Sequence, residues 1–145
     1  MKIGIASDHR GYKLKEQIKE KITDIKVIDY GTDSEEICDY PDYAFKLGEK
    51  VANKEVDFGV AICGSGIGIG IACNKVKGIR CATVRTVDDV KMTRNDNNAN
   101  IIAISEKTDI GTALKLINTM VNTPFAGIDR YKRRINKMRD YEENN

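Results

Sequence analysis

The chain has 145 residues, of which 41% are hydrophobic and 32% are charged. This length suits one domain with one core, and this composition excludes a disordered or fibrous chain. The formal net charge is only +2, which argues against a nucleic-acid coat. No apolar run approaches the ~20 residues of a membrane-spanning helix, and the first residues lack a signal peptide's apolar core. We therefore expect a cytoplasmic protein with neither a membrane nor a nucleic acid as partner.

The four cysteines and the single histidine do not have the spacing of a metal site. Cys38, Cys63, Cys73 and Cys81 form no C-x-x-C pair, and His9 is the only imidazole. A structural zinc ion is therefore not expected, and without a secretion signal the thiols should stay reduced.

Short apolar runs alternate with amphipathic stretches along the chain, which predicts consecutive βαβ units and a parallel sheet between layers of helices. In chain order we expect strand 2–6, a helix carrying Leu14, Ile18 and Ile22, strand 26–30, helix 41–52, strand 56–63, helix 68–76, strand 79–85, helix 87–95, strand 100–104 and helix 109–122. The run 56–63 is almost continuously apolar, which is typical of a central strand that is buried on both faces.

A basic segment follows Pro124, which should end the last full helix. Its six cations are Arg130, Lys132, Arg133, Arg134, Lys137 and Arg139. We expect residues from about 126 to 145 to be helical, either as an exposed helix or as an arm that packs on a second subunit. The arginines could bind phosphate, although a run of basic residues on a terminal helix is more often a solvated face.

Ligands of parallel α/β sheets bind at the carboxyl ends of the strands, so the residues there are the candidates for a site. Asp8 and His9 follow the first strand, residues 63–68 follow the third, and Lys107 follows the fifth. Asp8 and His9 could hold sugar hydroxyls or a phosphate, and the alternative is that His9 is an ordinary loop residue.

The segment 64–70 has four alternating glycines but no nucleotide-binding pattern. Ile69 stands where G-x-G-x-x-G requires glycine, and the Lys-Ser/Thr pair of a Walker A loop is missing. A strand that runs through glycines into a helix instead exposes backbone N–H groups that can bind an anion or an oxyanion. The alternative is that the glycines only allow close packing of helix on strand.

Cys63 ends the central strand beside these N–H groups. A thiolate there would be stabilised by the positive end of the helix dipole and could act as a base or a nucleophile. The alternative is a buried structural cysteine, which is the common fate of this residue type.

Six ordered blocks resemble B-type ribose-5-phosphate isomerases and the related galactose-6-phosphate isomerases over essentially the whole chain. The blocks are Ser7 to Lys15, Asp39-Tyr40-Pro41, Ile62 to Gly68, Ala72 to Lys75, Gly78-Ile79-Arg80 and Asn98 to Ile101. The resemblance implies a single-domain, Rossmann-like α/β/α sandwich with a five-stranded parallel sheet and no bound nucleotide. It further implies chemistry without a metal or other cofactor, and a homodimer, or a dimer of dimers, whose sites use both subunits.

The same resemblance assigns roles to individual residues. Cys63 becomes the base that moves a proton between carbons one and two of an open-chain sugar phosphate, with the Ser65 hydroxyl assisting. The residues placed around the substrate are Asp8, His9, Tyr40, Gly64, Gly66, Ile67, Gly68, Asn97, Lys107, Arg130 and Arg134. Residues 64–68 would bind the enediolate oxygen, and Asn97 a substrate hydroxyl. Lys107, Arg130 and Arg134 fall on phosphate-binding positions, some of which reach across the dimer.

Two departures from the family concern ring opening. Many members have a histidine before the asparagine that matches Asn97, and a second after the first arginine of the basic segment. This chain has Asp96 and Tyr131 there. Asp96 is thus a candidate catalytic acid, provided that burial keeps it protonated. The other possibility is that the enzyme takes sugars that have already opened.

These residues predict a metal-independent aldose–ketose isomerase that interconverts ribose 5-phosphate and ribulose 5-phosphate through a cis-enediol. Some galactose-6-phosphate isomerase subunits share an acidic residue near position 96 and a pair like Val84-Arg85, and they work with an unlike subunit. A hexose 6-phosphate (galactose or allose), with or without a partner subunit, is therefore the first alternative. A phosphosugar-binding protein without catalysis is the second, although the presence of both Cys63 and Ser65 argues against it.

Overall fold

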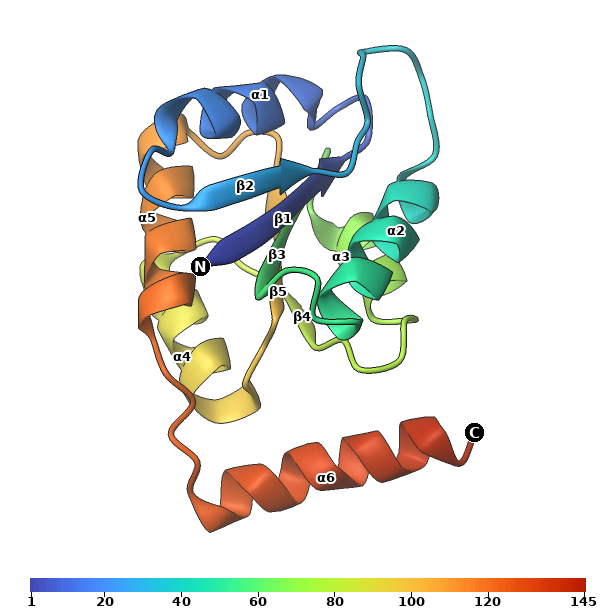
Figure 1. Ribbon diagram of the computed structural model, residues 1–145, viewed down its shortest axis with the longest axis vertical. Coiled ribbons are helices and arrows are strands. Elements are labelled where there is room, and N and C mark those ends of the chain that lie inside the picture. The colour runs from blue at the N-terminus through green and yellow to red at the C-terminus, as the bar shows by residue number, and fades with distance from the viewer.

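Five parallel strands form one sheet in the order β2-β1-β3-β5-β4 (Figure 1). This computed structural model describes residues 1–145. The strands are Lys2–Ser7 (β1), Lys26–Asp29 (β2), Phe58–Cys63 (β3), Cys81–Thr83 (β4) and Ile101–Ser105 (β5). The chain leaves β1 for β2 on one side and then returns to β3 on the other, so the sheet reverses its order between β1 and β3.

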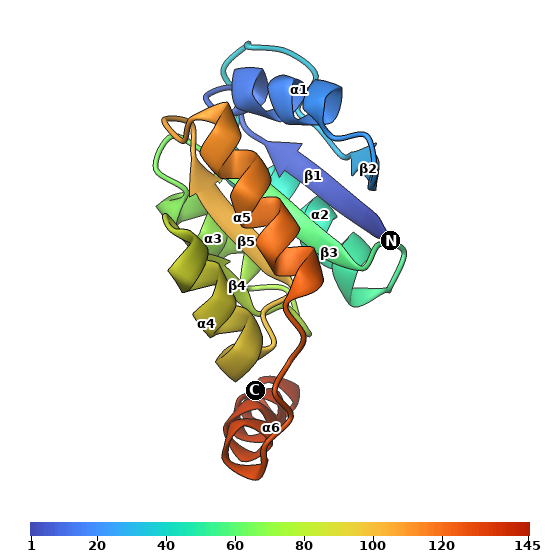
Figure 2. The same cartoon turned by 90° about the vertical axis from the view of Figure 1, so that its left-hand side faces the viewer.

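Helices cover both faces of the sheet, as the sequence predicted (Figure 2). They are Tyr12–Lys21 (α1), Tyr40–Ala52 (α2), Ile67–Cys73 (α3), Val87–Asn97 (α4), Ile110–Asn122 (α5) and Asp129–Glu143 (α6). Helices α1, α4 and α5 pack on one face, and α2 and α3 pack on the other. The α/β/α sandwich is therefore confirmed, and no helix is both long and apolar enough to cross a membrane.

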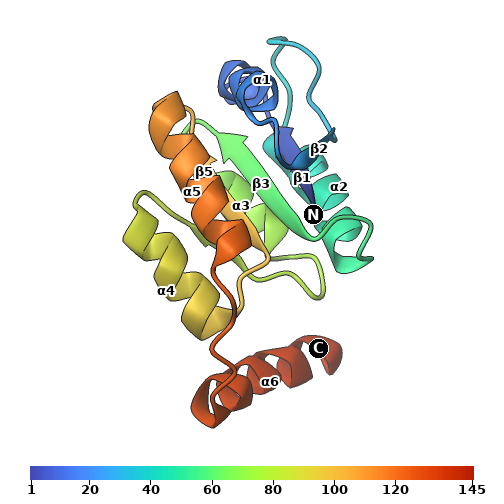
Figure 3. The same cartoon turned by 60° about the vertical axis from the view of Figure 1, so that its left-hand side comes forward.

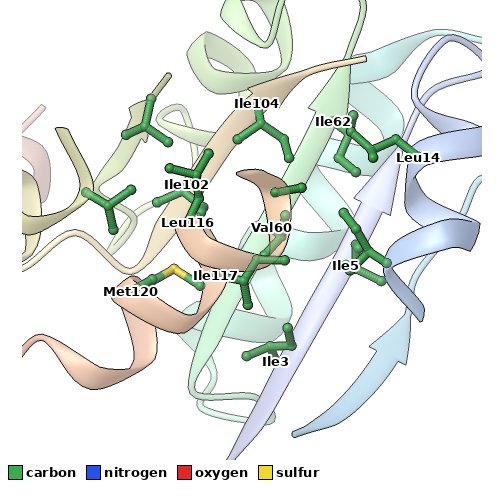
Figure 4. Close-up of a cluster of buried hydrophobic side chains, with 14 residues drawn as sticks. Ile3, Ile5, Leu14, Val60, Ile62, Ile102, Ile104, Leu116, Ile117 and Met120 are labelled. Carbon is green, nitrogen blue, oxygen red and sulfur yellow. The ribbon is translucent and has the colours of Figure 1, made fainter. Parts of the chain in front are cut away.

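Strand β3 lies at the centre of the core and contributes side chains to both faces. Val60 and Ile62 point toward α1 and α5, where they meet Ile102, Ile104 and Ile117 (Figure 4). Ala61 and Cys63 alternate with them and belong to the smaller side chains under α2 and α3. Burying each large aliphatic side chain contributes about 1.5–3 kcal/mol, so this double burial fixes the position of Cys63 firmly.

The edge strand β4 is shorter than the expected strand 79–85. The Arg80 backbone N–H donates to the side-chain Oδ1 of Asn100 at 2.9 Å and not to a strand carbonyl. Its guanidinium turns to the carbonyls of Asn97 and Asn98 at the end of α4. The expected helix 68–76 likewise ends at Cys73.

Helix α6 lies apart from the layers and extends beyond the end of the sheet opposite the carboxyl end of β3 (Figure 3). Ile135 is its only buried residue. The basic segment is thus an exposed helix within one chain, and its packing on a second subunit stays a prediction.

Candidate active site

A cleft of about 960 Å³ opens at the carboxyl ends of the strands. It includes the point between β1 and β3 where the strand order reverses, which is the usual place for a ligand in such sheets. Its lining residues are Asp8, His9, Arg10, Tyr40, Cys63, Gly64, Ser65, Gly68, Val84, Arg85, Ser105, Lys107, Thr108, Asp109 and Thr112.

Cys63 is the last residue of β3, and its side chain is almost fully buried. The Gly66 backbone N–H donates to its sulfur at 3.2 Å. Gly66 can turn back in this way because its φ is +79°, and a Cβ there would lie 2.8 Å from the Ile104 carbonyl carbon. The sequence therefore places glycine where the chain must bend tightly around the thiol.

The first turn of α3 faces the cleft directly after this bend. Ser65 is exposed, and its hydroxyl accepts the Ile67 N–H at 3.1 Å. Gly68 lines the cleft and packs so closely on Tyr40 that an added Cβ would lie 2.8 Å from the phenol ring. Backbone N–H groups at a helix start lack partners within the helix, so this turn can donate to an oxyanion.

Asp8 is buried in the turn between β1 and α1. Its Oδ1 accepts the backbone N–H groups of Arg10 at 2.9 Å and Gly11 at 3.1 Å. A Cβ on Gly11 would lie 2.6 Å from the Ile62 carbonyl oxygen, so only glycine lets this turn sit against β3. The turn therefore holds a carboxylate in the same cleft as Cys63.

His9 follows Asp8, and its ring is fixed by the loop before α2. Its Nδ1 accepts the Cys38 backbone N–H at 3.3 Å, and the Cys38 sulfur lies 3.9 Å away. A neutral imidazole that accepts at Nδ1 carries its proton on Nε2. His9 can therefore present a donor to a substrate oxygen.

Several lining residues were not among the predicted site residues. Arg10 and Arg85 add two cations to that of Lys107, and Ser105 orders the loop by donating to the Gly64 carbonyl at 2.7 Å. Asp109 caps α5, and hydrogen bonds from Thr112 hold the pKa of its carboxyl below the ordinary value. Arg10, Arg85, Ser105 and Asp109 lie at the end of a strand or in the loop that follows it, so the rule that led to Lys107 could have found them.

The cleft carries more cations than free carboxylates. Asp8 and Asp109 are already engaged by N–H and hydroxyl donors, whereas Arg85 and Lys107 form no ion pair within the chain. Such a balance suits an anionic ligand. No group of three or more His, Cys, Asp or Glu side chains is placed to hold a metal ion.

Six predicted site residues are not among those that line this cleft. Gly66 and Ile67 belong to the bend after Cys63 and the start of α3, and the other four are on α4 and α6. Asp96 and Asn97 are in the last turn of α4, where Asp96 accepts from Asn95 and Asn97 accepts from Thr93. Arg130 and Arg134 are exposed on α6, beyond the opposite end of the sheet (Figure 1). Within one chain the predicted site is therefore divided. The cleft brings together Cys63, Asp8, His9, Tyr40 and Lys107. Asp96 and Asn97 on α4 and Arg130 and Arg134 on α6 lie outside it.

Comparisons with known proteins all indicate the same family, and each covers nearly the whole chain. The family model described as Ribose/Galactose Isomerase matches residues 3–138. Ribose-5-phosphate isomerase B of Escherichia coli is 33% identical, with 98% of this chain and 97% of that protein covered. The structure of Clostridium thermocellum ribose-5-phosphate isomerase B has a TM-score of 0.94 and 42% identity, and 99% of both chains are covered.

A second solved structure holds a sugar phosphate. It is that of ribose-5-phosphate isomerase B of Mycoplasma genitalium with bound ribulose-5-phosphate. The two chains are 36% identical with a TM-score of 0.91, and the match covers 99% of this chain and 97% of that one. The predicted resemblance is confirmed: the chain belongs to the ribose/galactose isomerase family and is an aldose–ketose isomerase.

Proposed function

We propose that the protein interconverts ribose 5-phosphate and ribulose 5-phosphate without a metal, with Cys63 as the base. The observation that carries the proposal is the position of the Cys63 thiol, at the end of the central strand, in the cleft and hydrogen-bonded by Gly66. The relative from Mycoplasma genitalium, whose structure contains ribulose-5-phosphate, supports the choice of a pentose.

The chemistry requires one proton to move between neighbouring carbons. The Cys63 thiolate takes the proton from carbon two of the open aldose, and the electron pair shifts to make the carbonyl oxygen on carbon one an enediolate oxygen. The same thiol then returns a proton to carbon one, while the proton on the carbon-two hydroxyl passes to the oxygen on carbon one. No atom or electron is gained or lost, and Cys63 ends as it began.

The cleft can stabilise the negative charge that develops on the enediolate oxygen. The first turn of α3 offers fixed N–H donors near the thiol, and removing one such donor from an oxyanion site typically costs about 10²–10³ in rate. His9 and Lys107 offer polar hydrogens for the rest of the substrate, and both line the same cleft.

The test is an assay of the purified chain with ribose 5-phosphate, allose 6-phosphate and galactose 6-phosphate, each with and without a chelator. Turnover of the pentose in the presence of chelator supports the proposal, whereas turnover of only a hexose phosphate assigns a different substrate. Cys63→Ala should abolish turnover but keep phosphosugar binding, measured by calorimetry. If Cys63→Ala keeps its turnover, Cys63 is not the base, and if the wild type binds without turnover, the chain is a binding protein.

A further inference from the structure

Arg10 lies over the catalytic loop in a fixed orientation. Its Nε and one terminal nitrogen donate to the two carboxylate oxygens of Glu106, at 2.7 and 3.2 Å. The guanidinium carbon lies 3.5 Å, and the other terminal nitrogen 3.8 Å, from the place where a Cβ on Gly64 would sit. The two ion-pair partners are 96 positions apart in the sequence, so the fold itself sets this geometry.

The two partners differ in their access to the cleft. Arg10 lines it, as do Cys63 and Gly64, whereas Glu106 is not among the lining residues. The Arg10 side chain is 56% exposed and that of Glu106 is 24% exposed. A two-point pair of this kind holds the planar guanidinium in one plane and leaves its remaining N–H groups free.

Electrostatics agrees with this geometry. The hydrogen bond with Glu106, followed by its charge, raises the pKa of Arg10. The guanidinium therefore stays charged beside Gly64, the residue that follows Cys63. The hydrogen bond from Arg10 likewise lowers the pKa of Glu106, which keeps the partner ionised.

We propose that Arg10 is a further catalytic residue whose free guanidinium edge stabilises the enediolate oxygen, and that Glu106 is its positioning residue. This inference rests on the proposed isomerisation, because an enediolate forms only in that reaction. Glu106 holds the Arg10 guanidinium in place before the charge develops, so little reorganisation is needed during the reaction. Arg10 thus adds a side-chain donor to the backbone N–H groups of α3.

The test compares the wild type with Arg10→Met, Arg10→Lys, Glu106→Gln and the double variant Arg10→Met/Glu106→Gln. Lys50→Met is the matched control, because it also removes one cation and one partly exposed ion pair but lies outside the cleft. Each variant is assayed for kcat and KM. Inhibition constants are measured for erythronate 4-phosphate, whose carboxylate takes the place of carbons one and two of the enediolate, and for inorganic phosphate.

Arg10→Met should lower kcat by about 10²-fold and weaken the binding of erythronate 4-phosphate to a similar degree. Its KM and its inhibition by phosphate should stay within about twofold of the wild type, and Arg10→Lys should recover part of kcat. Glu106→Gln should lower kcat by about tenfold, and the double variant should be no slower than Arg10→Met, since Glu106 acts through Arg10.

Three results would overturn the assignment. An unchanged kcat in Arg10→Met removes Arg10 from the reaction, and a raised KM with weaker phosphate inhibition at normal kcat places it at the phosphate instead. Additive losses in the double variant show that Glu106 does not act through Arg10. Failure of the proposed function is a separate result, in which the wild-type chain itself isomerises no sugar phosphate.

Discussion

The Gly66 amide nitrogen lies 3.2 Å from the Cys63 sulfur, so the loop after β3 folds back to hydrogen-bond the side chain at its own start. Gly66 has a φ of +79°, and its Cα lies against the backbone of Ile104 on β5. The thiol, the tight turn and the start of α3 therefore form one unit that no other residue type at position 66 would allow.

Gly66→Ala should cost about 1–3 kcal/mol of stability because of the positive φ. It should also lower kcat, because the displaced turn moves the N–H donors. Urea unfolding and steady-state kinetics measure the two effects. Gly64→Ala is the control for stability: its added Cβ meets only the Arg10 side chain, at an ordinary 3.5 Å. Equal stability of the two variants would contradict this interpretation of the turn.

A second prediction concerns a fully buried lysine. Lys15 Nζ lies 2.6 Å from Asp29 and 3.3 Å from Glu16, and its side chain is 0% exposed. Asp29→Asn removes the closer carboxylate from a buried cation, so it should cost about 3 kcal/mol. The half-exposed Lys19 also contacts Asp29, and Lys19→Met should cost only about 0.5 kcal/mol. A smaller loss for Asp29→Asn than for Lys19→Met in denaturant unfolding would contradict this ranking.

The same carboxylate makes stability depend on pH. Burial raises the pKa of Asp29, but hydrogen bonds from Lys15 and Lys19 outweigh it and leave the pKa below its ordinary value. A carboxyl whose pKa is lower in the folded state stabilises the protein above its unfolded pKa, about 3.9, and loses that effect as the pH falls through the folded value. The difference in the free energy of unfolding between wild type and Asp29→Asn should therefore be full at pH 6 and become smaller below about pH 4. A difference that grows as the pH falls would show that the Asp29 carboxylate does not stabilise the fold in this way.

Arg134 is predicted to bind the substrate phosphate although it lies outside the cleft of its own chain. A hydrogen bond to a charged group contributes about 1.5–3 kcal/mol, so Arg134→Ala should raise KM about tenfold or more. Lys137→Ala removes a neighbouring cation of α6 that the resemblance does not place at the substrate, and its KM should stay unchanged. If both variants raise KM equally, the effect comes from the overall positive charge of α6 and not from a specific contact of Arg134 with the phosphate.

A site shared between subunits can be tested by mixing two defective variants. Cys63→Ala and Arg134→Ala, unfolded together and refolded, should form mixed dimers in which one of the two sites is intact. With random pairing, about a quarter of all sites are then intact, so about a quarter of wild-type activity should return at low substrate. If activity does not rise above that of the separately refolded variants, each chain builds its site alone.

Asp96 is the predicted acid for ring opening. Ribulose 5-phosphate has no furanose ring to open, whereas ribose 5-phosphate does. Asp96→Asn should therefore slow the reaction from ribose 5-phosphate by about 10²-fold and leave the initial formation of open-chain aldehyde from ribulose 5-phosphate nearly unchanged. Equal slowing in both directions would remove Asp96 from ring opening.

Patterns within the sequence predicted most of this fold. The run 56–63 gave the central strand, Pro41 lies in the first turn of α2, and the order of strands and helices is as expected. The position of β5 between β3 and β4 could not be predicted, because the sequence of a βαβ unit does not specify which other strand each of its strands pairs with.

The site was predictable where its residues come directly after a strand. Asp8, His9 and Cys63 were found by that rule, and the structure places all three in one cleft. The pairing of Arg10 with Glu106 was not predictable, because it depends on how two distant turns meet. Lys15 was missed for a similar reason: its closer partner, Asp29, is on the next strand, and lysine is rarely buried.

The strand order also bears on how the chain acquires its structure during synthesis. Strands β2, β1 and β3 neighbour one another and are complete once residue 63 has been made. Strand β4 pairs only with β5, which lies later in the chain, so Cys81–Thr83 must wait unpaired until residue 105 has emerged. We therefore expect folding in two stages, with the half that carries Cys63 first and β5 as the strand that joins the other half to it.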